Sequence, residues 1–225
     1  MRLLAFDTAG DGCSAGCFAG AEPVAFARHA GASGQAERLV PMLAAVLADA
    51  GWGMEDLEAL AVTIGPGSFT GIRTGLAAAR GLALVRRLPA WPVTTLAALA
   101  AVADGADGLP LAVVLDARRG QVFLQRFDSS GAALDEPLML APELAAARLR
   151  EPHHLVGSGA VALLRHLDAT AMTLGDAVLD AVAVARAAAA ARGRGEAPVH
   201  GTALAPLYLR EPDARPSAGR SLLQA

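Results

Sequence analysis

Both halves of this 225-residue chain open on the same pattern, an apolar strand that ends in an aspartate, then a turn and a second strand. Residues 3–18 form the first copy, with Asp7 at the end of the apolar run, and residues 111–127 form the second, with Asp116 in the same place. One supersecondary unit that recurs about half a chain later favours two domains of like topology. Because strands alternate with amphipathic helical stretches, the pattern predicts the α/β class.

A strand, a tight turn and a helix of small residues follow one another between Leu57 and Leu84. The turn, which contains Gly65, Gly67 and Ser68, can bring backbone N–H groups close to an anion. It is one residue longer than the dinucleotide fingerprint, and the chain contains no lysine, so the turn is not a P-loop either. In the helix, small residues at i, i+4 spacing share one face, which lets another backbone approach closely.

The charge of the chain argues against strong, direct binding of nucleic acid. The net charge is -3, and the 19 basic residues are all arginines spread along the sequence rather than gathered in a stripe. The first apolar run is broken by Asp7 and has no cleavage-site pattern after it, so we interpret it as a core strand rather than a signal peptide. The sequence also lacks an uncharged apolar stretch of about 18 residues. We therefore expect a cytoplasmic protein.

The cysteines and histidines do not form a recognisable metal motif. Cys13 and Cys17 are spaced to share one strand face, and we interpret them as buried thiols rather than a metal or redox pair. The five histidines are His29, His153, His154, His166 and His200, and none lies four residues from another. A metal site needs three or more converging ligands, so we predict no metal in this chain.

Five sequence blocks are spread over nearly the whole chain. They are LLAFDTA (Leu3–Ala9), GPGSFTGIRTGLAAARGLAL (Gly65–Leu84), LDARRGQVF (Leu115–Phe123), VGSGA (Val156–Ala160) and APLYLR (Ala205–Arg210). In this order the blocks resemble the TsaB family, also called YeaZ, within the acetate kinase/Hsp70/actin superfamily. The GPGSFTG-x-R block is the most specific of the five, and the others are specific only in combination.

The resemblance implies a two-domain actin-like fold (ASKHA, ribonuclease H-like) with a duplicated mixed sheet and flanking helices. We assign residues 1–103 to an N-terminal, partner-binding domain, residues 104–210 to a C-terminal domain and residues 211–225 to a mobile tail. The resemblance also implies that the chain is a non-catalytic subunit, which dimerises with TsaD and activates it. The reaction is the threonylcarbamoyladenosine modification of tRNA at the adenosine next to the anticodon. The TsaE ATPase joins the pair, and tRNA is met only through the complex.

The same resemblance implies that the isolated chain holds no cofactor, and that nucleotide and metal belong to partner subunits or to the joint. An exposed helix face that pairs with a paralogue can also pair with itself, so the sequence leaves both a homodimer and a monomer open when the partner is absent. Many family members place a histidine before the first helix, where this chain has Gln35. By analogy, no residue is assigned as catalytic, and the candidate vestigial nucleotide-loop residues are Asp7, Gly65, Gly67, Ser68, Asp116, Gly157 and Gly159.

Family members pair through helices of the N-terminal domain, so we expect the interface on two helix faces of this chain. If the small face meets the partner, a Gly75→Leu substitution should block docking and leave the fold intact. Both helices could instead cover their own sheet, which is the default in an α/β layer. The predicted interface residues are Leu39, Met42, Leu43, Val46 and Leu47 in the apolar stripe, and Gly71, Gly75, Ala78 and Ala79 in the small face.

Three other functions stay open from the sequence. An ASKHA-type nucleotide-dependent phosphotransferase would need a second catalytic acid near a strand–Asp turn, and Asp11 is the one candidate that we find. A metalloprotease-like hydrolase, as old glycoprotease annotations of the family suggest, would need the missing histidine pair. A generic α/β binding domain would leave the five blocks unexplained.

Overall fold

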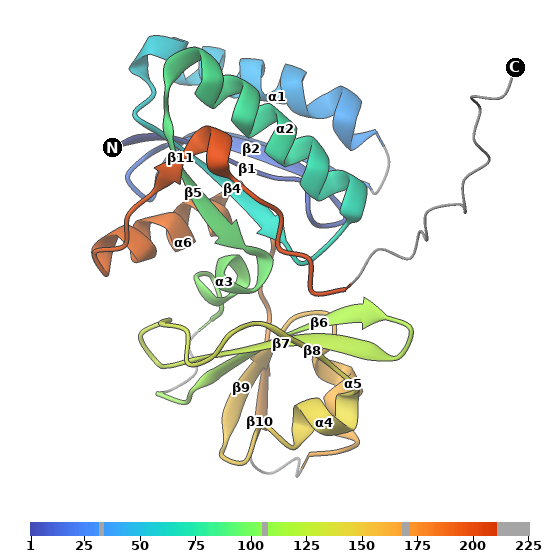
Figure 1. The fold of residues 1–225 in the computed structure, drawn as a ribbon. Helices are drawn as coiled ribbons and strands as arrows, with labels where there is room; N and C mark the ends of the chain where they lie inside the picture. Colours follow the sequence, from blue (N-terminus) through green and yellow to red (C-terminus); the bar gives the residue numbers. More distant parts are fainter. Residues whose placement is uncertain (32–33, 105–107, 168–171, 211–225) are drawn as a thin grey trace, which may run out of the picture.

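The computed structural model describes residues 1–31, 34–104, 108–167 and 172–210, which form two α/β units stacked one above the other (Figure 1). Each unit is built on one mixed sheet, and the chain crosses from one unit to the other more than once. The predicted tail, 211–225, lies outside the described residues.

The first sheet has six strands in the order β11-β5-β4-β1-β2-β3. The hairpin of β1 and β2 is antiparallel, and β4 and β5 then add in parallel on the other side of β1. Side chains alternate along β1, so Leu4 and Phe6 face one layer of helices and Leu3 and Ala5 face the other. The strands are β1 (Arg2–Asp7), β2 (Gly12–Ala19), β3 (Glu22–Ala30), β4 (Ala59–Gly65), β5 (Pro89–Thr94) and β11 (Val199–His200).

The second sheet repeats this topology in five strands, β10-β9-β6-β7-β8. Here β6 and β7 make the antiparallel hairpin, and β9 and β10 add in parallel beside β6. The repeat predicted from the two strand–Asp–turn–strand openings is therefore confirmed, with β11 as an extra edge strand on the first sheet. The strands are β6 (Leu111–Arg118), β7 (Gln121–Phe127), β8 (Leu138–Leu140), β9 (His153–Val156) and β10 (Met172–Gly175).

Helices cover corresponding faces of the two sheets. In the first unit, α1 (Gln35–Ala50) and α2 (Phe69–Arg86) lie on one face and share its hydrophobic core. In the second, α4 (Pro142–Ala146) and α5 (Ala160–Leu164) do the same. The bounds of α1 are set locally, because its apolar residues recur with helical spacing between Gly34 and Gly51, two glycines in left-handed backbone.

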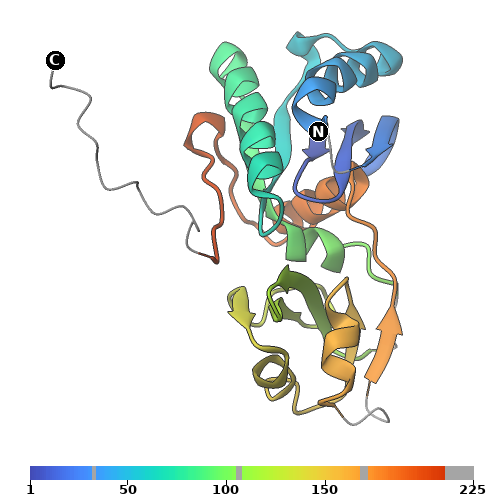
Figure 2. The ribbon, with the colours of Figure 1, turned by 90° about the vertical axis from the view of Figure 1, so that its right-hand side faces the viewer.

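The last helix of each repeat packs away from the strands that precede it. Helix α3 (Thr95–Ala100) follows β5 but places Leu96 and Leu99 against the second sheet, whereas α6 (Ala181–Gly193) follows β10 but covers the first sheet (Figure 2). The predicted assignment of 104–210 to one domain is corrected: from α6 through β11 the chain belongs to the first unit. The physical reason is that the open face of the first sheet is apolar and must be covered.

Short one-turn helices, Met54–Asp56 and Gly201–Ala203, complete the described elements. Within the described ranges, no helix is both long and apolar enough to cross a membrane.

Candidate functional site

Asp7, at the end of β1, is held by its own loop and by β4. Its Oδ1 accepts hydrogen bonds from Ala9 N at 3.0 Å and Thr63 Oγ1 at 2.7 Å, and its Oδ2 accepts one from Gly10 N at 3.4 Å. Burial raises the pKa of the Asp7 carboxyl, although these hydrogen bonds oppose the shift and the nearby Asp180 carboxylate adds to it. Both carboxylate oxygens are thus already occupied by donors from the protein.

The turn between β4 and α2 is closed against the β1 loop. Ser68 Oγ accepts from Gly71 N at 3.2 Å and caps α2, while Ser68 N donates to Ala9 O at 2.8 Å. A Cβ on Gly67 would overlap the Ala9 carbonyl oxygen, so glycine is what allows the two loops to touch. The two loops that would surround a phosphate are therefore hydrogen-bonded to each other.

The corresponding turn of the second unit shows the same close packing. Asp116 Oδ1 accepts from Arg118 N at 2.7 Å, and Asp116 N donates to Ser158 Oγ at 3.1 Å. A Cβ on Gly157 or Gly159 would collide with the backbone of β6, so these glycines let the β9–α5 turn lie on that strand.

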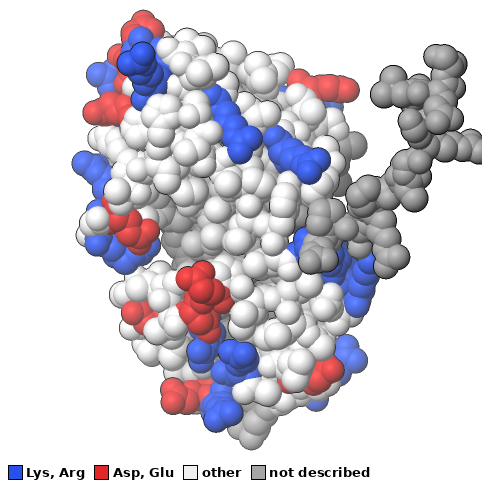
Figure 3. Space-filling model, viewed as in Figure 1, with Lys and Arg blue, Asp and Glu red and all other residues white. Residues whose placement is uncertain are grey.

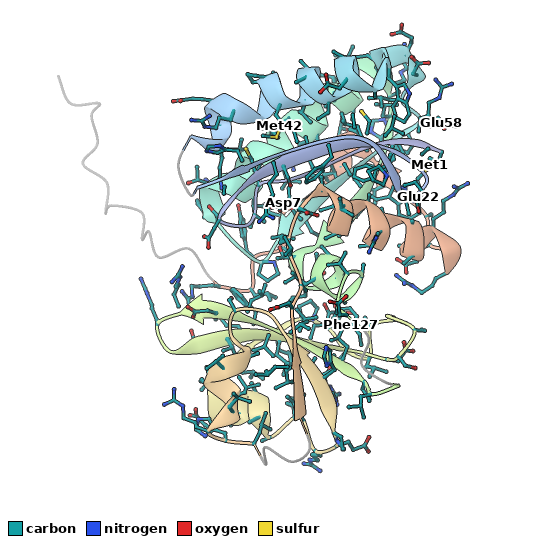
Figure 4. All side chains as sticks on the ribbon, turned by 180° about the vertical axis from the view of Figure 1, so that it is seen from behind. Met1, Asp7, Glu22, Met42, Glu58 and Phe127 are labelled. Carbon is teal, nitrogen blue, oxygen red and sulfur yellow. The ribbon has the colours of Figure 1, made fainter. Side chains whose placement is uncertain are left out.

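A cleft of about 1000 Å³ opens between the two units and collects most of the predicted loop residues. In Figure 4, Asp7 lies at the edge of the first unit that faces the second. Arginines 28, 118 and 210 add positive charge to the cleft wall. Gly65 and Gly159 do not line it, whereas Asp7, Gly67, Ser68, Asp116 and Gly157 do.

The apolar stripe of α1 is occupied by the chain's own core. Leu39, Leu43 and Val46 are buried against the first sheet, and Met42 and Leu47 are partly buried against the same cluster. The predicted interface is therefore corrected at the three buried leucine and valine positions, because an amphipathic helix on a sheet turns its apolar stripe inward. At Met42 and Leu47 it stays a prediction.

The small face of α2 is also occupied. A Cβ on Gly71 would overlap the Thr8 carbonyl oxygen, and one on Gly75 would lie 2.5 Å from Thr8 Oγ1, which itself donates to Gly71 O at 2.7 Å. Ala79 is fully buried and Ala78 is partly buried. The glycines thus serve close packing of α2 on its own sheet, and Gly75→Leu is expected to disturb the fold, contrary to the prediction.

The opposite side of α2 is exposed, and Figure 3 shows mostly uncharged surface crossed by separate basic side chains on this side of the first unit. Leu84 and Val85 are 72% and 79% exposed, and Val40 on the neighbouring α1 is 63% exposed. Thr70, Arg80, Gly81 and Arg86 of α2 are exposed as well. We call five of the exposed residues the outer face of α2, namely Phe69, Arg73, Ala77, Leu84 and Val85. Sequence reasoning missed this face, although Leu84 and Val85 lie off the face set by Ile72, Leu76 and Ala83.

At the start of this face, three side chains form one cluster. The rings of Phe69 and Tyr208 lie 5.3 Å apart, the Arg73 guanidinium stacks on Phe69 at 3.8 Å, and Arg73 Nε donates to Tyr208 Oη at 3.0 Å. Arg80 Nε also donates to Leu204 O at 3.0 Å. These contacts fix the segment 204–210, which carries the APLYLR block, against α2.

Comparison with known proteins identifies the family. The model of the family described as TsaD, tRNA N6-adenosine threonylcarbamoyltransferase, matches residues 30–210. The Escherichia coli protein named tRNA threonylcarbamoyladenosine biosynthesis protein TsaB is 34% identical over 156 residues, which cover 67% of either chain. The chain belongs to the TsaB (YeaZ) family.

Solved structures agree with this assignment. A Pseudomonas aeruginosa protein described as similar to peptidase YEAZ superposes with a TM-score of 0.79 at 26% identity, covering 93% of this chain and 99% of that one. A hexokinase of the ROK type from Thermus thermophilus, at 15% identity and a TM-score of 0.53, shares the fold alone. The predicted duplicated actin-like fold is confirmed.

Two features of this chain bear on chemistry at the site. Gln35, where the family resemblance led us to expect histidine, is buried and donates through Nε2 to Gly10 O at 3.1 Å and Gly12 O at 2.8 Å. It therefore fixes the β1–β2 turn against α1. Among the described residues, no three His, Cys, Asp or Glu side chains gather closely enough to hold a metal ion.

Proposed function

We propose that this chain acts in tRNA threonylcarbamoyladenosine biosynthesis as a non-catalytic, cytoplasmic subunit that docks on a TsaD-type transferase and activates it. The name of the E. coli relative supports the pathway, and the match to the TsaD model supports pairing with a paralogue of like fold. The observation that carries the proposal is the contrast between closed loops and an exposed helix. The turn before α2 is hydrogen-bonded to the β1 loop through Ser68 N and Ala9 O, while the outer face of α2 exposes Leu84 and Val85.

The outer face of α2 is the surface that we assign to the partner. Protein interfaces are built around apolar and aromatic residues with arginine, which is the composition of this face. The earlier interface residues on α1 and α2 stabilise these helices from beneath, so they act on docking through the position of the helix. A homodimer through the same face is our expectation for the chain alone.

Paired double variants test this surface. Leu84→Glu with Val85→Glu places two charges on the outer face of α2, whereas Leu144→Glu with Val161→Glu places two charges on exposed positions of the second unit. Co-purification with the cognate TsaD-type protein should be lost in the first variant and kept in the second. Equal retention in both variants would refute the assignment of the docking face.

We propose further that nucleotide and metal belong to partner subunits or to the joint between them, that a TsaE-type ATPase joins the complex, and that tRNA is bound productively only there. An ASKHA-type phosphotransferase is the alternative that the inter-unit cleft favours, because Asp7 and Asp116 both line it. Calorimetry of the isolated chain with ATP and magnesium discriminates between a non-catalytic subunit and a phosphotransferase. Micromolar binding would favour the phosphotransferase.

A further inference from the structure

A second concave site lies on the second unit, where the end of β7 meets the connection from α4 to β9. Its volume is about 470 Å³, and three arginines, Arg126, Arg148 and Arg150, line it together with Glu151 and His153. We call it the arginine pocket. The helix α4 and strand β9 lie at the opposite end of the molecule from α1 and α2 (Figure 1), so docking at the outer face of α2 leaves the arginine pocket open.

One guanidinium is held in place. Arg126 Nε pairs with Asp135 Oδ2 at 2.7 Å, and Arg126 Nη1 donates to Arg148 O at 3.4 Å. The floor is fixed as well, since His153 is buried and its Nδ1 donates to Glu151 O at 2.6 Å. The base of the arginine pocket is thus ordered by contacts within the chain.

The other two guanidiniums carry its free charge. Leu149 is buried, and Arg148 and Arg150 on either side of it are exposed. Neither side chain makes an ion pair or hydrogen bond with any described residue. Asp135 is engaged by Arg126, which leaves Glu151 as the acidic side chain of the lining. The arginine pocket therefore keeps an excess of positive charge in a chain whose net charge is -3.

We propose that the arginine pocket binds the phosphodiester backbone of RNA and so gives this subunit its own contact with the tRNA that the complex modifies. The guanidinium presents a planar fork of donors that matches two phosphate oxygens, and it is more weakly hydrated than an ammonium group. RNA, rather than an acidic protein, is the ligand that the proposed function brings to this surface. The inference rests on that function for the identity of the ligand, and on the described contacts for the site.

The test uses the complex of this chain with the cognate TsaD-type protein, a tRNA transcript and filter binding as a function of salt concentration. Arg148→Gln with Arg150→Gln removes the two unpaired charges, and Arg87→Gln with Arg192→Gln removes two exposed charges from the first unit as a control. Because each lost phosphate contact reduces the salt slope by about one, the first variant should lower the slope of log K against log salt by about two. Its affinity at low salt should fall by at least about tenfold. Both variants should melt within about 2 °C of the wild type, because they change exposed side chains.

Several outcomes would overturn the proposal. Equal losses in both variants would mean diffuse attraction, and an unchanged salt slope in the pocket variant would mean that the arginine pocket holds no RNA. Displacement of the transcript by 1 mM ATP, with that displacement lost in the pocket variant, would mean a mononucleotide site. The amount of TsaD-type protein in each complex is measured separately, so a failure of partner docking is distinguished from a loss of the RNA contact.

Discussion

Replacing one glycine of α2 tests whether the small face packs on its own sheet or is available to bind a partner protein. A Cβ on Gly75 would lie 2.5 Å from Thr8 Oγ1 and 3.4 Å from Val62 Cγ2, and all three residues are buried. Thr8 cannot yield freely, because its hydroxyl donates to Gly71 O at 2.7 Å. Gly75→Ala should therefore either shift α2 outward or break this hydrogen bond.

The expected cost follows from three opposing effects. Overpacking of a filled core costs about 1–3 kcal/mol. Loss of the Thr8 hydrogen bond lowers the free energy of unfolding by about 1 kcal/mol more, whereas the higher helix propensity of alanine relative to glycine raises it by about 1 kcal/mol. Gly75→Ala should thus lower the free energy of unfolding by about 1–3 kcal/mol. Gly81 lies on the exposed side of the same helix, with nothing within 4 Å of its Cβ position, so Gly81→Ala should raise that free energy by about 1 kcal/mol.

Urea denaturation followed by circular dichroism measures both variants under one set of conditions. The two free energies of unfolding should differ by about 2–4 kcal/mol, with opposite signs relative to the wild type. If Gly75→Ala is as stable as Gly81→Ala, the Thr8 contact does not constrain the helix. The small face would then again be a candidate docking surface.

Three further predictions follow from the described side chains. Burial raises the pKa of Asp7 above its ordinary 3.8, so the wild type loses stability as pH rises from below 3.8 through the pKa of the folded state. The free energy of unfolding of Asp7→Asn, taken relative to that of the wild type, should therefore rise over the same interval. Urea titrations from pH 4 to 8 measure this difference, and a difference that does not change with pH would contradict the prediction. Asp180 Oδ1 accepts hydrogen bonds from Val182 N and Ala183 N in the first turn of α6, so Asp180→Ala should lower the unfolding free energy by about 1 kcal/mol. An unchanged urea midpoint would contradict the cap. Burial raises the pKa of Cys17 to about 11 and also raises the pKa of Cys13. Neither thiol should therefore react with Ellman's reagent at pH 8 in the folded chain. Rapid labelling without denaturant would contradict this prediction.

The duplication could be predicted from the sequence because a local pattern, the strand–Asp–turn–strand unit, occurs twice. An apolar strand, an aspartate and a turn are short-range features, and their recurrence at Asp7 and Asp116 matches the topology of the two sheets. The bounds of α1 were predictable for the same reason, since periodicity and flanking glycines fix them locally.

The positions of α3 and α6 could not be predicted in this way. An alanine-rich stretch such as Ala181–Gly193 shows helical propensity, but nothing in its spacing says which sheet it covers. That choice depends on which sheet has an open apolar face, a property of the assembled chain. The two-residue strand β11 is too short to carry a pattern of its own.

At the candidate site, too, features set by local sequence could be predicted, whereas contacts between residues far apart in sequence could not. Spacing identified the small face of α2 correctly but could not show that Thr8 fills it, because that contact joins residues far apart in sequence. The cluster of Phe69, Arg73 and Tyr208 likewise joins α2 to the APLYLR block near the end of the described chain. Which side of a helix stays exposed is decided by such contacts.

Reconstitution of the modification reaction tests the central claim most directly. A tRNA transcript, the threonylcarbamoyl-adenylate donor, and the cognate TsaD-type and TsaE-type proteins are combined with and without this chain, and threonylcarbamoyladenosine is measured by mass spectrometry of the digested tRNA. We predict product with the wild-type chain, none with the chain in the absence of the TsaD-type protein, and a strong loss with Leu84→Glu and Val85→Glu. Full product in reactions that omit this chain, or product from this chain without the TsaD-type protein, would contradict its role as a non-catalytic activating subunit.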